Sequence, residues 1–469
     1  MVLARSILVL VVTLAIAADA AVVRAQLADP GAAKAADTCQ RAVAKGGATF
    51  AAGTAKSLGA CFGGVFKCVQ TKPGDAKCLA KAVARCAKET DAGRITRLSK
   101  LAASVGGKCT RLADLRAADG LGYDTLAGAC AGTGAFVDVP AVVDCIRAEL
   151  ECRTERAFAA AMPRARSLAA EHAIPLRADS CLVDLGGAGN VPDPRGVGKP
   201  LDKCQALATK AAAGFAAAKH KGLGKCATTI FGCVQTKPGD TKCTDKAAAQ
   251  CAKVITSAIP AAEAKVEEKI GAGCGAIFGQ AGAANAIGVD ALAADCQQVG
   301  VGALASAADW GRCVMRRHEC AVEAMQPFLT PRFAALLAGL GQSATSAFCA
   351  GIPTPTPGGT ATITPTAAGS TPTLTVTPTA TGPTASPTPS PAPSPNIVFV
   401  SSQTYATTLG SAAAYDAQCN VLATGAGLNN GTDDAFVAWI SDSSSDAVER
   451  LGAARGFVRV DGVPVADTV

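Results

Sequence analysis

Apolar and polar residues in the first 350 positions follow a helical pattern. Alanine, leucine, lysine and arginine dominate, and alternating β-branched residues are scarce. Pro-Gly-Asp turns interrupt the pattern twice, and Asp75 and Asp240 stand where an N-cap begins the next helix. Pro140 stands at a position typical of a first helical turn. The pattern predicts an all-α fold for this part of the chain.

The helical region is an internal duplication. Ten cysteines recur in order, at an offset that grows from 165 to 168 residues, and many other residues recur with them. We therefore predict two tandem, disulfide-rich domains, repeat 1 over 36–190 and repeat 2 over 200–350. The matched cysteines are Cys39/Cys204, Cys61/Cys226, Cys68/Cys233, Cys78/Cys243, Cys86/Cys251, Cys109/Cys274, Cys130/Cys296, Cys145/Cys313, Cys152/Cys320 and Cys181/Cys349.

Four cysteines in each repeat have the spacing of a helical hairpin. Residues seven apart on a helix differ by about 20° in direction and lie about 10 Å apart along its axis. Two helices that fold back at the Pro-Gly-Asp turn bring an inner and an outer pair together. The other pairings stay open, but the even number of cysteines predicts five disulfides within each repeat and none between repeats. The hairpin disulfides that we predict are Cys68–Cys78, Cys61–Cys86, Cys233–Cys243 and Cys226–Cys251.

The N-terminus has the pattern of an export signal. Arg5 precedes an apolar run over 6–17, and small residues with A-x-A-like sites follow. We predict a signal peptide over 1–25, cleaved after Ala25. The first cysteine comes well after the apolar run, which argues against a lipid anchor, and no later segment has the pattern of a membrane span. The predicted location is secreted, periplasmic or at the cell surface.

Composition changes abruptly after repeat 2. Residues 352–395 contain 12 prolines and 14 threonines, and no charged or aromatic residue. Such a sequence cannot bury a core, so we predict a disordered, extended Pro/Thr-rich stalk. A folded pattern returns after it: 397–400, 435–440 and 456–461 have the composition of strands, and 411–422 that of a helix.

A series of motifs follows in order through residues 396–469, at 399–405, 409–410, 415–419, 426–428, 438–443 and 458–467. With these motifs the segment resembles the DUF1554 family of bacterial surface and secreted proteins. The resemblance implies a partial α+β domain related to the endostatin and C-type-lectin-like fold, with no catalytic residues. The family continues beyond the position of Val469 with more strands and another cysteine, so we expect this domain to be incomplete and Cys419 to be unpaired in this chain.

Cysteine content and charge narrow the classes of function. Much of the apolar content is alanine, which buries little area per residue, so we expect the 21 cysteines to compensate in an oxidising compartment. Residues 1–350 hold 41 basic and 29 acidic residues, and a basic face attracts anionic polymers. Aromatic residues are not interleaved with the basic residues in the way that binding of single-stranded nucleic acid requires, so we expect no nucleic-acid partner.

We predict no catalytic, cofactor or metal site. The sequence has no C-x-x-C motif and no histidine at zinc spacing near a cysteine pair. His172, His220 and His318 have no histidine at the matched position of the other repeat, so a histidine site common to both repeats is not expected.

The best candidates for acid–base chemistry are two repeated carboxylate pairs. Glu151 and Glu155 lie four residues apart on one helix face, and Glu319 with Glu323 repeats them. The alternative, which we favour, is a solvated or arginine-paired face, with Arg164 and Arg332 as candidate partners.

The nearly identical turns at 72–77 and 237–242 also allow two interpretations. They are either recognition loops or tight turns that need proline and glycine for geometry and aspartate for the cap, and we favour the turns. The sequence as a whole predicts an exported, non-enzymatic, modular protein whose lectin-like domain binds a glycan or a matrix protein. A structural envelope scaffold without a ligand is the alternative, a secreted hydrolase is a minor one, and the oligomeric state stays open.

Overall fold

The computed structural model describes residues 26–130, 136–350, 396–398, 412–425, 436–438, 455–459 and 464–468. These form two compact units, and the boundary between them falls after residue 364. The predicted signal peptide and the predicted Pro/Thr-rich stalk lie outside the described residues.

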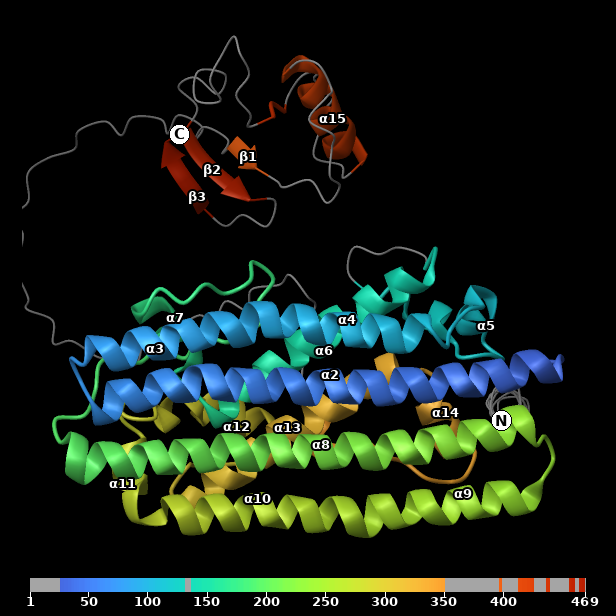
Figure 1. The fold of residues 1–469 in the computed structure, drawn as a ribbon, viewed down its shortest axis with the longest axis horizontal. Coiled ribbons are helices and arrows are strands. Elements are labelled where there is room, and N and C mark those ends of the chain that lie inside the picture. The colour runs from blue at the N-terminus through green and yellow to red at the C-terminus, as the bar shows by residue number, and fades with distance from the viewer. Residues whose placement is uncertain are drawn as a thin grey trace, which may run out of the picture. The chain divides into compact units, whose positions relative to one another are not determined.

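The first unit is helical and disulfide-rich, as predicted, and the main helices of repeat 1 recur in the same order in repeat 2 (Figure 1). Repeat 1 contains α2 (Pro30–Thr71), α3 (Ala76–Ala87), the π-helical η1 (Lys88–Ala92), α4 (Gly93–Gly106), α5 (Leu112–Arg116), the 3-10 helix η2 (Tyr123–Leu126), α6 (Val139–Ala161) and α7 (Ala165–Glu171). Repeat 2 contains η3 (Pro194–Gly198), α8 (Lys199–Thr236), α9 (Thr241–Lys253), η4 (Val254–Ala258), α10 (Ile259–Cys274), η5 (Gly275–Ile277), α11 (Phe278–Ala281), η6 (Val289–Leu292), α12 (Ala293–Gln298), α13 (Ala307–Leu329), α14 (Phe333–Ala338) and η7 (Ala347–Cys349).

Matched caps begin the matched helices. The carboxylates of Asp75 and Asp240 each accept the backbone N–H three residues on, at 2.9 and 3.1 Å, and both predicted caps are confirmed. Asp138 caps α6 and its counterpart Ser306 caps α13, although the residue type differs. These side chains satisfy N–H groups that the first helical turn leaves without a partner.

Ten disulfides lie within the repeats, five in each, and none joins one repeat to the other in the described chain. The sequence separations match almost throughout, at 70, 25, 10 and 29 residues in both repeats and at 15 against 17 in the remaining pair. The four hairpin pairs are those that the spacing predicts. The disulfides are Cys39–Cys109, Cys61–Cys86, Cys68–Cys78, Cys130–Cys145, Cys152–Cys181, Cys204–Cys274, Cys226–Cys251, Cys233–Cys243, Cys296–Cys313 and Cys320–Cys349.

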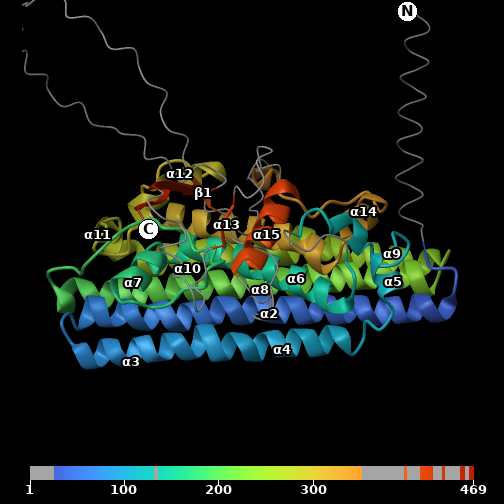
Figure 2. The ribbon, with the colours of Figure 1, turned by 90° about the horizontal axis from the view of Figure 1, so that it is seen from above.

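The two repeats share one core and do not form separate domains. Helices α2 and α8, each about 60 Å long, run side by side, with α3 and α4 along the outer side of α2 and α9 and α10 along the outer side of α8 (Figure 1). Helices α6 and α13 pack against each other and cover one side of the α2/α8 pair (Figure 2). The buried residues of both repeats belong to a single hydrophobic cluster.

Matched glutamines bind the last turn of a helix in the opposite repeat. The Gln40 amide on α2 donates from Nε2 to the carbonyl of Leu329, the last residue of α13, at 2.7 Å. Its counterpart Gln205 on α8 donates to the carbonyl of Ala161, the last residue of α6. Both glutamines are buried. Each repeat therefore satisfies a helix-terminal carbonyl of the other.

Matched arginines make a second reciprocal contact. Arg164 Nη1 donates to the carbonyls of Asn285 and Ala286, both at 3.1 Å, in the loop before η6. Arg332 Nη1 donates to the carbonyls of Asp119 and Gly120, at 2.7 and 3.0 Å, in the equivalent loop of repeat 1.

The two loops that receive these arginines have the same backbone geometry. Gly122 and Gly288 have φ of +86° and +83°, a region that favours glycine. Contacts of this reciprocal kind define an isologous interface, in which each half offers the other the same surface. The duplication thus builds a two-fold pseudodimer within one chain.

The second unit contains strands and a helix. β1 (Asn396–Val398) pairs in parallel with β2 (Arg455–Arg459), which pairs antiparallel with β3 (Pro464–Thr468). In α15 (Ala412–Gly425), Asp416 accepts the backbone N–H of Ala438 at 2.7 Å, and Asn420 exchanges two hydrogen bonds with the backbone of Phe436. The expected strand over 435–440 is described only at 436–438, where it is irregular. Cys419 lies in α15, outside the ten disulfides.

We predict that Arg164→Met and Arg332→Met destabilise the helical unit by similar amounts, about 2–3 kcal/mol each, because each leaves buried carbonyls of the other repeat without a charged donor. Chemical denaturation measures the loss. Arg116→Met is the matched control, because Arg116 pairs with Asp124 and both side chains are well exposed, and it is expected to cost less than about 1 kcal/mol. Losses at Arg164 and Arg332 no larger than the control's would contradict this account of the interface.

Candidate functional site

The carboxylate pair of repeat 1 lies buried between α6 and the segment after α7. Glu151 binds Arg94 through two contacts of 2.6 and 2.9 Å and binds Arg147 at 3.0 Å. Both carboxylates are almost completely buried, Glu151 at 1% and Glu155 at 4% exposure. A solvated face, one of the two alternatives, is therefore wrong for this pair, and the arginine-paired alternative holds.

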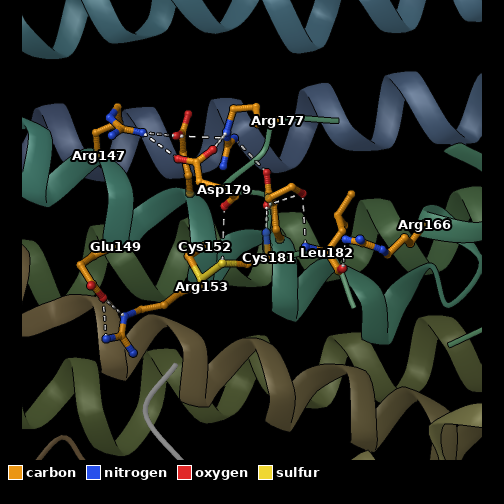
Figure 3. Close-up of a disulfide and its surroundings, with 12 residues drawn as sticks. Arg147, Glu149, Cys152, Arg153, Arg166, Arg177, Asp179, Cys181 and Leu182 are labelled. Carbon is orange, nitrogen blue, oxygen red and sulfur yellow. Dashed lines mark hydrogen bonds and ion pairs between the residues drawn. A yellow bond between two sulfur atoms is a disulfide. The ribbon is translucent and has the colours of Figure 1, made fainter. Parts of the chain in front are cut away.

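Glu155 holds the C-terminal segment of repeat 1 beside the Cys152–Cys181 disulfide (Figure 3). It accepts from the backbone N–H of Cys181 at 2.6 Å, from the Ser180 hydroxyl at 3.0 Å and from Arg177 Nη1 at 2.9 Å. Burial raises the pKa of Glu155, and the charge of Arg177 opposes that rise. All the contacts of this carboxylate go to its own repeat, so its role is to fix the segment that carries Cys181.

The equivalent pair in repeat 2 uses a different cation. Lys219 on α8 is buried and places its Nζ 2.7 Å from Glu319 and 2.6 Å from Glu323. The Ser346 hydroxyl lies within hydrogen-bond distance of both carboxylates, 2.6 Å from Glu319 and 2.7 Å from Glu323, and the Ser346 backbone N–H donates to Glu323 at 3.0 Å. Burial and the neighbouring charge of Glu319 raise the pKa of Glu263 on α10 to about 7. Three carboxyl groups thus surround one lysine.

The arginines named as candidate partners do not contact these carboxylates. Arg164 and Arg332 extend to the backbone of the opposite repeat. Sequence reasoning missed the partners that bind, because Arg94 and Lys219 have no cation at the matched position of the other repeat. The contact that both repeats share runs from the second carboxylate of the pair to a backbone N–H near the last cysteine. This arrangement favours a structural role over acid–base catalysis.

A further buried ion pair is confined to repeat 1. Arg153 and Glu149, four residues apart on α6, meet at 2.7 Å with both side chains at most 3% exposed (Figure 3). The Arg153 guanidinium also lies 5.1 Å from the ring centroid of Phe328 in repeat 2, a cation–π contact across the two repeats.

Two of the histidines line a small cavity between the repeats. His220 on α8 and His318 on α13 are buried there, among alanines, Thr154, Val322 and Met325. Burial lowers the pKa of both imidazoles to about 4, and the charge of Lys219 contributes for His220. No carboxylate or cysteine lines this cavity, so its lining offers no acidic partner that would orient a histidine as a catalytic base.

The Pro-Gly-Asp turns have the geometry that their composition predicts. Gly74 and Gly239 have φ of +81° and +78°, and the aspartate that follows each glycine is the cap of the next helix. These requirements explain proline, glycine and aspartate in both copies without a ligand.

The described part of the chain contains no metal-site cluster and no membrane-spanning helix. No group of three or more histidine, cysteine, aspartate or glutamate side chains there is placed to hold a metal ion. None of the described helices combines the length and the hydropathy that a membrane span needs. No family model, curated protein or solved structure matches the chain.

We predict that Glu155→Ala costs about 3–5 kcal/mol of unfolding free energy, because it leaves Arg177 and the Cys181 N–H without their buried acceptor. The same change should speed the reduction of Cys152–Cys181 by a small thiol more than that of Cys68–Cys78, which joins α2 to α3 at the Pro-Gly-Asp turn. Glu267→Ala, which removes a carboxylate in a partly exposed pair with Arg312, is the control and should cost less than about 1 kcal/mol. Equal losses for the two variants would contradict the anchoring role.

We also predict that the two buried histidines make the fold less stable in acid. A histidine binds a proton below about pH 6.5 in the unfolded chain, but only near pH 4 in the fold, so stability falls as pH falls through that window. Each histidine contributes up to about 3 kcal/mol of this loss. Urea denaturation between about pH 7 and pH 4 measures it.

The variant His220→Ala with His318→Leu carries the residues of repeat 1 at these positions. It should lose much less stability across the same pH range. The carboxylates are the same in both chains, so their own pH dependence cancels in the comparison. Parallel pH profiles for the two chains would show that the prediction is wrong.

Proposed function

We propose that this chain is an exported binding protein, in which the helical unit is a rigid support and the DUF1554-like segment contacts an extracellular glycan or matrix protein. The ten disulfides carry the first part of the proposal. They close loops in both repeats, and proteins with this many structural disulfides belong to oxidising compartments. The predicted signal peptide over 1–25 gives the export route.

The construction of the helical unit favours its role as a rigid support. Its core is continuous across both repeats, and its disulfides restrict the unfolded chain, each by about 2–4 kcal/mol. Glu155 and Glu323 each belong to one of the two carboxylate pairs that were candidates for acid–base chemistry. Each of them accepts a backbone N–H close to a disulfide of its own repeat. Residues committed to such contacts are not free to move protons for a substrate.

The second unit supports a role in binding. It combines a mixed sheet with a helix, as expected of an α+β domain. Asp416, in a motif that carries the family resemblance, and Asn420, one helical turn later, fix the backbone of 436–438. Binding residues on loops that a rigid scaffold positions are a common design of extracellular recognition domains.

The test uses arrays of glycans and matrix proteins. The full chain should bind a defined subset of them, and Asp416→Ala with Asn420→Ala should abolish that binding because the 436–438 segment loses its anchor. A chain that ends at residue 350 is the second comparison, since the helical unit has its own core and its disulfides can be counted by mass.

Each outcome decides between the classes of function. Loss of binding in both altered chains, with ten disulfides intact, supports the proposal. Equal binding by the chain that ends at residue 350 would move the binding site to the helical repeats. No binding by the full chain to any array would favour a structural scaffold without a specific ligand.

A further inference from the structure

The helical unit has an apolar groove between α8 and α10, with a volume of about 770 Å³. Leu207, Phe215 and Val266 supply most of its apolar lining, together with alanines of both helices. Phe215 and Val266 are buried, whereas Leu207 is partly exposed. The volume lies in the range of pockets that hold small molecules.

Close contacts with α8 bound the groove at both ends. At one end α10 approaches α8, where a Cβ atom at Gly273 would lie 2.7 Å from Leu207. At the other end η4 approaches α8, where a Cβ atom at Gly222 would lie 2.9 Å from Val254. Between these contacts a Cβ atom at Gly214 would meet nothing within 4 Å. The separation of residues 207 and 222 on α8 corresponds to about 22 Å along the helix. An extended, narrow ligand fits such a space better than a compact one.

Positive charge lines this groove and negative charge faces away from it. Lys210 on α8 and Lys265 and Lys269 on α10 lie along it, all three are exposed, and no acidic residue is among its lining. The carboxylates of Glu263 and Glu267, also on α10, interact instead with Glu319 and Arg312 of α13. An apolar floor with a cationic rim complements a molecule that has an apolar chain and an anionic head.

In repeat 1 a side chain occupies the position that corresponds to this groove, between α2 and α4. Arg97 on α4 is the counterpart of Ala262, and its side chain lies over Gly53 on α2, where a Cβ atom would come within 2.6 Å of it. Arg97 is held there by a 2.6 Å hydrogen bond to the Ser57 hydroxyl. The matched position thus carries a long, fixed side chain in repeat 1 and a methyl group in repeat 2.

From this groove, its charge and its divergence from repeat 1, we propose that repeat 2 binds a fatty acid. The acyl chain lies on the floor formed by Phe215 and Val266, and the carboxylate interacts with the lysines of the rim. This site is independent of the glycan or matrix binding proposed for the second unit, since it uses α8 and α10 alone.

The first experiment titrates the full chain with dodecanoate, below the concentration at which it forms micelles, by calorimetry. Dodecyltrimethylammonium has the same chain length and the opposite charge. We expect saturable binding of dodecanoate and at least tenfold weaker binding of the cation. Ala262→Arg, which copies repeat 1, should weaken dodecanoate binding at least tenfold while the ten disulfides and the melting temperature are kept.

The second experiment separates the charge from the shape. Lys210→Gln with Lys265→Gln should weaken dodecanoate binding several-fold and reduce its dependence on salt, and it tests the proposal even if Ala262→Arg fails to fold. Lys45→Gln with Lys100→Gln makes the same changes at the matched positions of repeat 1 and is expected to leave binding unchanged.

Several results would overturn the proposal. They are an absence of saturable dodecanoate binding, equal binding of the cation, or equal losses from the lysine variants of the two repeats. A dimer in sedimentation that Ala262→Arg dissociates would show that a second copy of the chain covers the groove, which also contradicts it.

Discussion

Reciprocal hydrogen bonds from buried side chains of one repeat to backbone carbonyls of the other are the interaction on which the helical unit depends. Alanine-rich helices such as α2 and α8 approach closely but bury little area per residue. Gln40 and Gln205 bind the last carbonyls of α13 and α6, and Arg164 and Arg332 bind the adjoining loops. A buried carbonyl without a donor is costly, so each repeat needs the other to complete its helix ends.

Disulfides and interface contacts act at different levels. Each of the ten disulfides joins two cysteines of one repeat and limits the conformations of the unfolded chain. The interface contacts fix the orientation of the two repeats relative to each other. A frame fixed in this way tolerates divergence elsewhere. One carboxylate pair is neutralised by three arginines and the other by Lys219, and the matched helix pairs are closed by Arg97 in repeat 1 and open beside Ala262 in repeat 2.

Features with a local cause were predictable from the sequence. Cysteine spacing around a Pro-Gly-Asp turn gave the hairpin disulfides, and Asp75 and Asp240 were identifiable as caps. Contacts between distant segments were not predictable, because the sequence offset between the repeats shows which positions match but not which residues they contact. Arg164 and Arg332 were expected beside glutamates and lie instead against backbone of the other repeat. Gln40 and Gln205 could have indicated a buried hydrogen bond, because an amide at matched positions among buried apolar residues needs a specific partner.

The central claim is that the two repeats form one cooperative unit, and Trp310 allows a direct measurement. Its indole N–H in repeat 2 donates to the carbonyl of Ala160 in repeat 1 at 3.1 Å, so its fluorescence reports on the interface. In a chain with Trp439→Phe, urea unfolding followed by Trp310 fluorescence and by far-ultraviolet circular dichroism should give coincident transitions. A fluorescence change that precedes most of the loss of helix, or two separate helical transitions, would show that the repeats fold independently and would contradict the account.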